Sequence, residues 1–262
     1  MPGTDLDLLI SAAETAGEIA KGYFQDNPQI WDKGGGAGPV TEADLAVNEH
    51  LAQTLGSARP DYGWLSEETE DDTLRLRTQR QFVVDPIDGT RAFIEGSQNW
   101  AHAVAVVEGG QPISAVVYMP AKDLLFAASE GRGATLNGQP IAISPKTDML
   151  GATVLSNKQS YRDETWADGA PPKGLTRHFR SSLAYRLCLV AQGRFDAMMT
   201  LRPSWEWDIV AGALIVKEAG GTVTDQNGFN LQFNNPHPQV NGVIAGGAVA
   251  SQITTALACN TP

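Results

Sequence analysis

Hydrophobic positions near the start of the chain recur at the spacing of amphipathic helices. Within the first twenty residues, small and aliphatic side chains return every three or four positions: Leu9, Ala13, Ala16 and Ala20. Thr4 followed by Asp7 is typical of a capping box that begins such a helix. A second helix is predicted from Thr41 to Leu55, with Thr41 as its N-cap and Asp44 three residues later.

The pattern then changes to short β-branched runs. Gln81–Val84 is apolar and typical of a buried strand. Further strand-like runs follow: Ala103–Val107, Ile113–Tyr118, Leu124–Ala128 and Ile141–Ile143. Glycine-containing turns at 109–110, 131–133 and 137–138 punctuate them. Consecutive strands joined by short turns predict an antiparallel meander.

From about residue 150 onward, strand-like and helical patterns alternate. The predicted strands are Ala152–Leu155, Thr222–Thr224 and Gly242–Ala245. The predicted helices are Leu183–Gln192, Asp208–Ala219 and Val249–Ala258. Helices flanking sheets of different character favour a layered α/β fold. We expect a single domain over residues 1–262, with sub-halves 1–148 and 149–262.

The composition limits the functional classes to which this chain can belong. The chain has 19 Lys and Arg against 30 Asp and Glu, a formal net charge of −11. This acid excess argues against a nucleic-acid polymer or an anionic membrane as partner. The sequence has no apolar run of about 20 residues, the length that spans a bilayer. The two cysteines have no C-x-x-C spacing and the four histidines are scattered, so neither a disulfide framework nor a His-based metal site is expected. The N-terminal residues lack the features of a signal peptide, so a cytoplasmic location is expected.

The most informative chemistry lies in residues 84–90. Asp85 and Asp88 follow the predicted strand in a turn that Pro86 stiffens. Mg²⁺ takes carboxylate oxygens at about 2.0–2.1 Å, and a rigid turn offering two carboxylates suits it. Gly89 permits close backbone approach, and Thr90 is a candidate helix N-cap, so their N–H groups suit a phosphate oxygen. From these residues alone, an Asx-type turn without a ligand remains the alternative.

Four motifs together resemble the inositol monophosphatase superfamily of Mg²⁺-dependent, often lithium-sensitive phosphatases. They are Pro39–Asp44, Leu65–Glu68, Asp85–Thr90 and Trp207–Gly212. The resemblance covers nearly the whole chain. It implies a layered αβαβα sandwich of the inositol monophosphatase and fructose-1,6-bisphosphatase type, and a Mg²⁺-dependent phosphomonoesterase.

The resemblance also implies the metal ligands. Glu67, Asp85 and the Ile87 carbonyl would hold one Mg²⁺, while Asp85, Asp88 and Asp208 would hold a second, with Asp85 as the bridge. Glu67 would also serve a third, more hydrated cation. Two metals can lower the pKa of a bound water and clamp the attacking and leaving oxygens of an in-line displacement.

Further roles follow from the same resemblance. Thr90 and Asp44 would form a hydrogen-bonded pair that orients the attacking water. The Gly89 and Thr90 amides would receive the phosphate, and Glu68 would be a supporting residue.

Substrate contacts are expected around residues 181–186. Ser182, Tyr185 and Arg186 match the family segment that carries them, although Ser181 stands where the family usually has glycine. Tyr185 and Arg186 could meet a nucleobase or second phosphate, or could lie on a helix surface without contacting a ligand. Arg202 could pair with a phosphate or with the acidic surface.

Several segments are most similar to the bacterial 3′(2′),5′-bisphosphate nucleotidases, which favours adenosine 3′,5′-bisphosphate as the substrate. Ala92 departs from the glutamate of that subgroup, and inositol-1-monophosphatase and histidinol-phosphatase activities stay open. In each case the partner is a small-molecule phosphate ester, and the family suggests a homodimer. A non-catalytic protein that binds metal or phosphate is the alternative from another functional class.

Overall fold

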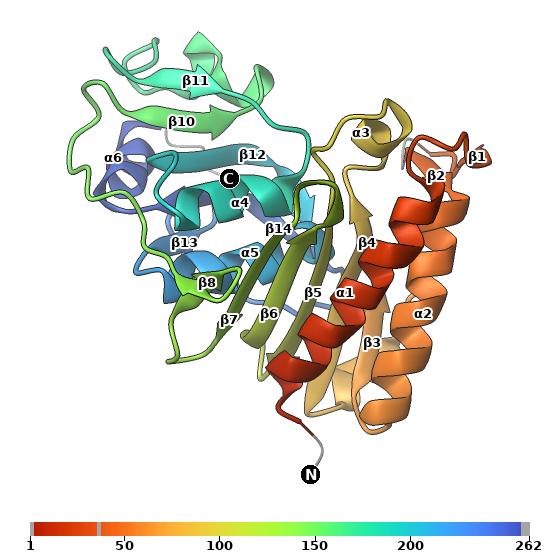
Figure 1. Ribbon diagram of the computed structural model, residues 1–262. Coiled ribbons are helices and arrows are strands. Elements are labelled where there is room, and N and C mark those ends of the chain that lie inside the picture. Colours follow the sequence, from red (N-terminus) through yellow and green to blue (C-terminus); the bar gives the residue numbers. More distant parts are fainter. Residues whose placement is uncertain (1–2, 36–37, 258–262) are drawn as a thin grey trace.

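Two long helices begin the chain and pack side by side on one face of a sheet (Figure 1). The computed structural model describes residues 3–35 and 38–257. Helices α1 (Asp5–Tyr23) and α2 (Glu42–Ala58) have the predicted capping boxes, Thr4 with Asp7 and Thr41 with Asp44. Between them lies a short hairpin of β1 (Ile30–Asp32) and β2 (Pro39–Thr41).

The larger sheet has seven strands in the order β3-β4-β5-β6-β7-β8-β9. Their bounds are β3 Gly63–Ser66, β4 Arg80–Asp88, β5 Ala101–Glu108, β6 Gln111–Met119, β7 Leu124–Ser129, β8 Ala134–Leu136 and β9 Gln139–Pro140. Strand β3 is parallel to β4, and every later pair is antiparallel, which confirms the meander. The strand predicted at Ile141–Ile143 is wrong. The Ile141 N–H still bonds the Ala134 carbonyl of β8, but the chain then leaves the sheet and the Ile143 N–H bonds the Ala219 carbonyl.

The smaller sheet has five strands in the order β11-β10-β12-β14-β13. Their bounds are β10 Thr153–Ser156, β11 Thr176–His178, β12 Ala197–Trp205, β13 Thr222–Thr224 and β14 Gln239–Gly246. Strands β10, β11 and β12 run parallel, whereas β14 is antiparallel to β12 and β13.

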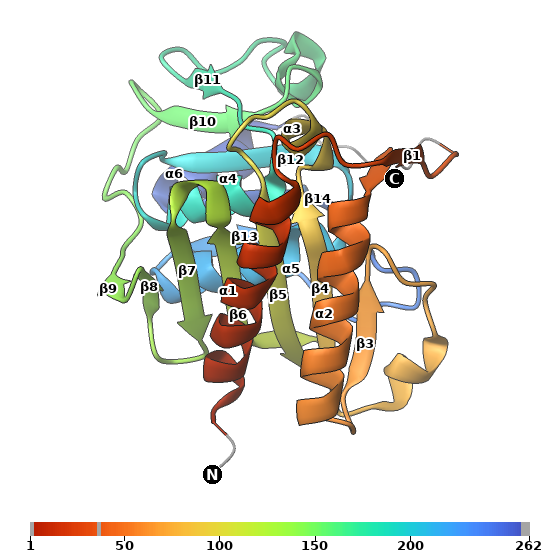
Figure 2. The same cartoon turned by 45° about the vertical axis from the view of Figure 1, so that its right-hand side comes forward.

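Three further helices complete the layers: α4 (Leu183–Ala191), α5 (Glu206–Glu218) and α6 (Ala248–Ala256). Helices α4 and α5 lie between the two sheets, and α6 covers the outer face of the smaller sheet (Figure 2). The order is therefore αβαβα, as expected. The shorter helices are η1 Thr73–Arg77, α3 Thr90–Ile94, η2 Pro120–Lys122, η3 Gln159–Tyr161 and η4 Asp163–Thr165.

Alternation along the strands divides the apolar side chains between the layers. In β4, Phe82 and Val84 face α1 and α2, while Val83 faces the core around α4 and α5. Both sheets contribute side chains to that central core. The division of the chain into two sub-halves stays a prediction. Among the described residues, no helix is long and apolar enough to cross a membrane. Ala258, at the end of the last predicted helix, and residues 36–37 of the glycine-rich loop lie outside the described residues.

Candidate active site

Three carboxylates from distant parts of the chain meet at the end of β4. Glu67 follows β3, Asp85 lies in β4, and Asp208 lies in the first turn of α5. One oxygen from each lies within 4.8 Å of the others. Like charges repel at such separations, so this arrangement suits a bound cation.

Asp85 is the least satisfied member of the cluster. Its residue is 1% exposed, and among the described residues its Oδ1 has no hydrogen-bond partner. Burial raises the pKa of the Asp85 carboxyl well above its usual value, and Glu67, Asp88 and Asp208 raise it further. A buried carboxylate oxygen without a donor is costly unless a cation meets it. An all-oxygen donor set of this kind fits a hard divalent cation.

Asp88 lies beside this cluster because β4 is irregular between Asp85 and Asp88. Residues three apart in a regular strand face opposite sides, whereas a bulge can turn both carboxylates to one side. The Asp88 Oδ2 accepts hydrogen bonds from Ser182 Oγ at 2.6 Å and from the Ala184 N–H at 2.7 Å. Burial raises the pKa of Asp88 to about 6, although these two hydrogen bonds oppose the shift.

Asp44 and Thr90 form the hydrogen-bonded pair that the resemblance implies. The Thr90 hydroxyl lies 3.1 Å from Asp44 Oδ1 and 3.2 Å from the Ile87 carbonyl oxygen. The other Asp44 oxygen accepts from the Thr41 N–H and hydroxyl at 2.8 and 2.6 Å. The capping box of α2 therefore fixes the carboxylate that faces Thr90. Burial raises the pKa of Asp44 to about 6.

Gly89, and not Thr90, is the N-cap of α3. Its φ of +103° is a conformation that L side chains rarely adopt, and a Cβ there would lie 3.0 Å from the Asn99 carbonyl oxygen. The predicted N-cap at Thr90 is therefore wrong by one residue. The Thr90 side chain hydrogen-bonds to Asp44 and does not cap α3.

Lys33, in the loop after β1, is a site residue that sequence reasoning missed. Its Nζ lies 2.7 Å from Glu67 Oε1 and 2.7 Å from Glu68 Oε1. Burial raises the pKa of Glu68 to about 7, an effect that Lys33 opposes. The available signal is a lysine directly before the glycine-rich loop that leads into Thr41 and Asp44.

Tyr185 and Arg186 are buried and are held by groups of the protein. The Tyr185 hydroxyl lies 3.5 Å from Lys122 Nζ. Arg186 donates to the Arg180 and Ser181 carbonyls, and its guanidinium stacks 4.6 Å from the Phe179 ring centre. Neither side chain lies on an exposed helix surface, and their contact with substrate stays a prediction.

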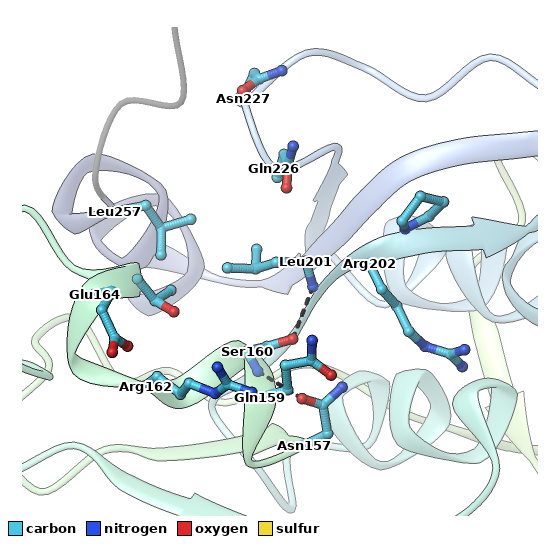
Figure 3. Close-up of a pocket in the computed structure, with 12 residues that line it drawn as sticks. Asn157, Gln159, Ser160, Arg162, Glu164, Leu201, Arg202, Gln226, Asn227 and Leu257 are labelled. Atoms are coloured by element: carbon cyan, nitrogen blue, oxygen red, sulfur yellow. Dashed lines mark hydrogen bonds between the residues drawn. The ribbon is translucent and has the colours of Figure 1, made fainter. Parts of the chain in front are cut away.

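Arg202 lies at the edge of a cavity of about 690 Å³ beside β12. Figure 3 shows Gln226 and Asn227 on one side of this cavity and Asn157 and Ser160 on the other. Burial raises the pKa of Asp208 well above its usual value, whereas Arg202 opposes the shift. Arg202 therefore acts electrostatically on Asp208.

Comparison with known proteins gives a consistent result. A model of the inositol monophosphatase family matches residues 4–261. An inositol monophosphatase 3 of Solanum lycopersicum is 33% identical, covering 87% of this chain and 88% of the relative. A histidinol-phosphatase of Mycobacterium tuberculosis is 33% identical, covering 93% and 96%. The crystal structure of the extragenic suppressor protein suhB from Bartonella henselae matches with a TM-score of 0.82 at 29% identity, covering 97% and 98%.

Proposed function

The chain belongs to the inositol monophosphatase family and is a phosphoric monoester hydrolase, and from that premise we propose a mechanism and a substrate class. It hydrolyses a small phosphate ester with Mg²⁺ held by Glu67, Asp85 and Asp208, together with Asp88 and the Ile87 carbonyl. Asp85 carries this proposal, because its buried Oδ1 has no hydrogen-bond partner among the described residues and its carboxylate groups with those of Glu67 and Asp208. Bound Mg²⁺ would lower the pKa of a water molecule and offset the charge of the phosphate.

The protein's own groups orient the reactants. Asp44 is fixed by Thr41 and accepts from the Thr90 hydroxyl, so a water placed against this pair would have a defined orientation. Gly89 lets the chain turn where a Cβ would lie 3.0 Å from the Asn99 carbonyl oxygen, and in this turn the Gly89 and Thr90 N–H groups would receive the phosphate. Glu68, paired with Lys33, would support Glu67.

We propose an inositol monophosphate as the leading substrate. The name of the Solanum relative supports it. Histidinol phosphate is the alternative that the mycobacterial relative suggests. A 3′,5′-bisphosphate nucleotide remains a candidate because Arg202, which acts electrostatically on Asp208, offers a cation for a second phosphate.

Phosphate release with and without Mg²⁺ tests the activity, using inositol 1-phosphate, histidinol phosphate, adenosine 3′,5′-bisphosphate and fructose 1,6-bisphosphate. Asp85→Asn should remove nearly all turnover while the circular dichroism spectrum stays that of the wild type, because the bridging carboxylate is lost. Turnover equal to the wild type at saturating Mg²⁺ would refute the assignment. Activity that is independent of Mg²⁺ would do the same. Inhibition by Li⁺, a homodimer and a cytoplasmic location stay predictions of the family resemblance.

A further inference from the structure

Glu206, the first residue of α5, is a buried acid outside the carboxylate cluster. It is 0% exposed and lies two residues before Asp208. Its Oε2 accepts from the Asn234 N–H at 2.6 Å, while Oε1 accepts from the Asn235 N–H at 2.9 Å and from Asn235 Nδ2 at 2.7 Å. Both oxygens are therefore occupied by donors of the protein, in contrast to Asp85.

Arg75 donates hydrogen bonds to the same two asparagines, Asn234 and Asn235. This residue is 2% exposed and lies in η1, which follows the turn carrying Glu67. Its guanidinium holds both oxygens of Asp71 at 2.6 and 2.8 Å. It also donates to Asn234 Oδ1 at 2.6 Å and to the Asn235 carbonyl at 2.9 Å.

The turn at Asn234 and Asn235 is thus clamped between an arginine and a glutamate. Asn234 has a positive φ of 61°, a conformation that asparagine tolerates better than most residues. The Glu206 N–H also donates to the Pro238 carbonyl at 2.9 Å, which fastens the following residues to the start of α5. We call Asp71, Arg75, Asn234, Asn235 and Glu206 the brace.

The brace connects two segments that each bear a member of the carboxylate cluster. Asp71 lies four residues after Glu67, and Glu206 lies two residues before Asp208. Without a divalent cation these two carboxylates repel each other. The Glu67 N–H bonds the Val84 carbonyl at 3.2 Å, which places Glu67 relative to β4, whereas its separation from Asp208 also depends on where α5 begins. Mg²⁺ demands near-ideal octahedral geometry, so small errors in that separation weaken binding.

We propose that the brace sets the separation of the Glu67 and Asp208 carboxylates, with Arg75 and Glu206 as positioning residues for divalent-cation binding. The inference rests on the proposed metal site. It differs from a purely stabilising role, because a network that only stabilised the fold would leave the cation affinity of the folded protein unchanged.

The test is Mg²⁺ binding, measured by isothermal titration calorimetry on the whole chain well below its melting temperature. Glu206→Gln places an amide where a carboxylate accepts three hydrogen bonds, and Arg75→Met removes the guanidinium at similar length. Each should raise the Kd for Mg²⁺ about tenfold or more, as expected for the loss of a positioning contact. Arg75 and Glu206 act through the same turn, so their effects should not add. The double variant should therefore bind Mg²⁺ little less tightly than the single variant with the higher Kd.

Arg59→Met is the matched control. The Arg59 guanidinium donates to Asp5 at 2.9 Å and to the Gly3 carbonyl at 2.9 Å, at the other end of α2 from Asp44. It should lower the melting temperature and leave the Kd for Mg²⁺ unchanged. Asn235→Ala is a milder variant in case the others do not fold, since it removes only the Asn235 side-chain bonds. It should weaken Mg²⁺ binding about threefold.

The outcomes separate the brace from the proposed function. A wild-type chain that binds no Mg²⁺ contradicts the metal site and the brace together. A wild-type chain that binds Mg²⁺, with Asn235→Ala and the folded brace variants binding within twofold of it, overturns the brace alone and leaves these residues as stabilisers of the fold.

Discussion

Lys33 determines the charge that the acidic cluster carries before a divalent cation binds. Its ammonium contacts Glu67 and Glu68, and the three side chains are largely shielded from solvent. Burial lowers the pKa of Lys33, but the two carboxylates outweigh burial and the net shift is upward. The ammonium therefore stays protonated at neutral pH, and a cation approaching Glu67 has to displace it.

Lys33→Met should consequently tighten Mg²⁺ binding while destabilising the metal-free protein. We expect the Kd for Mg²⁺ to fall about fivefold, corresponding to roughly 1 kcal/mol for a half-buried ion pair. The melting temperature in EDTA should fall at the same time. Calorimetry and thermal denaturation check both effects. Lys21→Met is the control because Lys21 pairs with Glu18 on the exposed surface of α1. A weaker affinity in Lys33→Met would show that Lys33 assists the cation instead of competing with it.

At the scale of elements, Ser182 connects the start of α4 to the acidic cluster. Its hydroxyl accepts from the Tyr185 N–H at 2.9 Å as the N-cap and donates to Asp88 at 2.6 Å. The Ser182 side chain thus caps the N-terminus of α4 and also holds the Asp88 carboxylate of β4. A substitution at the start of α4 should therefore alter the position of the Asp88 carboxylate beside the cluster.

Ser182→Ala should lower the free energy of unfolding by about 1–2 kcal/mol, since it removes an N-cap and a donor to a buried carboxylate. It should also reduce turnover at saturating Mg²⁺, because Asp88 keeps only the Ala184 N–H among these two donors. Urea denaturation and phosphate release measure the two effects. Thr4→Ala removes the N-cap of α1 and should cost about 1 kcal/mol without a loss of turnover. Equal turnover in both variants would contradict the connection to Asp88.

The sequence predicts most elements because their signals are local. Capping boxes and apolar spacing are sufficient for α1 and α2. Turn glycines separate β5 from β6 and β7 from β8, and a proline follows β6. Strand β12 escapes prediction because its first four residues are all buried and so do not alternate, and because Pro203 lies in its second half. In the structure, the register with β14 shifts between Thr200 and Pro203, which accommodates the proline.

The candidate site was predictable only in part for the same reason. Asp85 and Asp88 stand in one turn, and their chemistry is evident from the residues themselves. Glu67 joins them through the pairing of β3 with β4, and Asp208 through the packing of α5 on the larger sheet. Local patterns do not encode either contact, so their roles came from the resemblance. Lys33 and the brace have no motif, and their partners are known only once the chain is folded.

At the scale of the whole molecule, the site lies where the layers of the sandwich meet, so the stability of the layers bears on it. His102 in β5 is 0% exposed and belongs to the layer between the larger sheet and the first two helices. Its Nδ1 contacts the Pro86 carbonyl between Asp85 and Ile87, and its ring packs against Trp100 with centres 5.6 Å apart.

Burial, with a smaller effect from the nearby His50 of α2, lowers the pKa of His102 to about 4, although the hydrogen bond with Pro86 opposes the shift. The folded state therefore holds this imidazole neutral, whereas the unfolded chain protonates it near its usual pKa of about 6.5. Since the unfolded state binds the proton more readily, the contribution of His102 to stability is complete above pH 6.5. It is lost progressively as the pH falls toward 4.

His102→Asn should remove this dependence. In EDTA, the free energy of unfolding of the wild type should fall by about 3 kcal/mol more than that of the variant between pH 6.5 and pH 4. The difference isolates His102, because the acidic residues titrate in both proteins. His178→Asn, at an exposed position of β11, should follow the wild type. If the free energy of unfolding had the same pH dependence in the wild type and in His102→Asn, the folded protein would tolerate a charged His102 imidazole. The proposed cost of protonating His102 in the folded state would then be wrong.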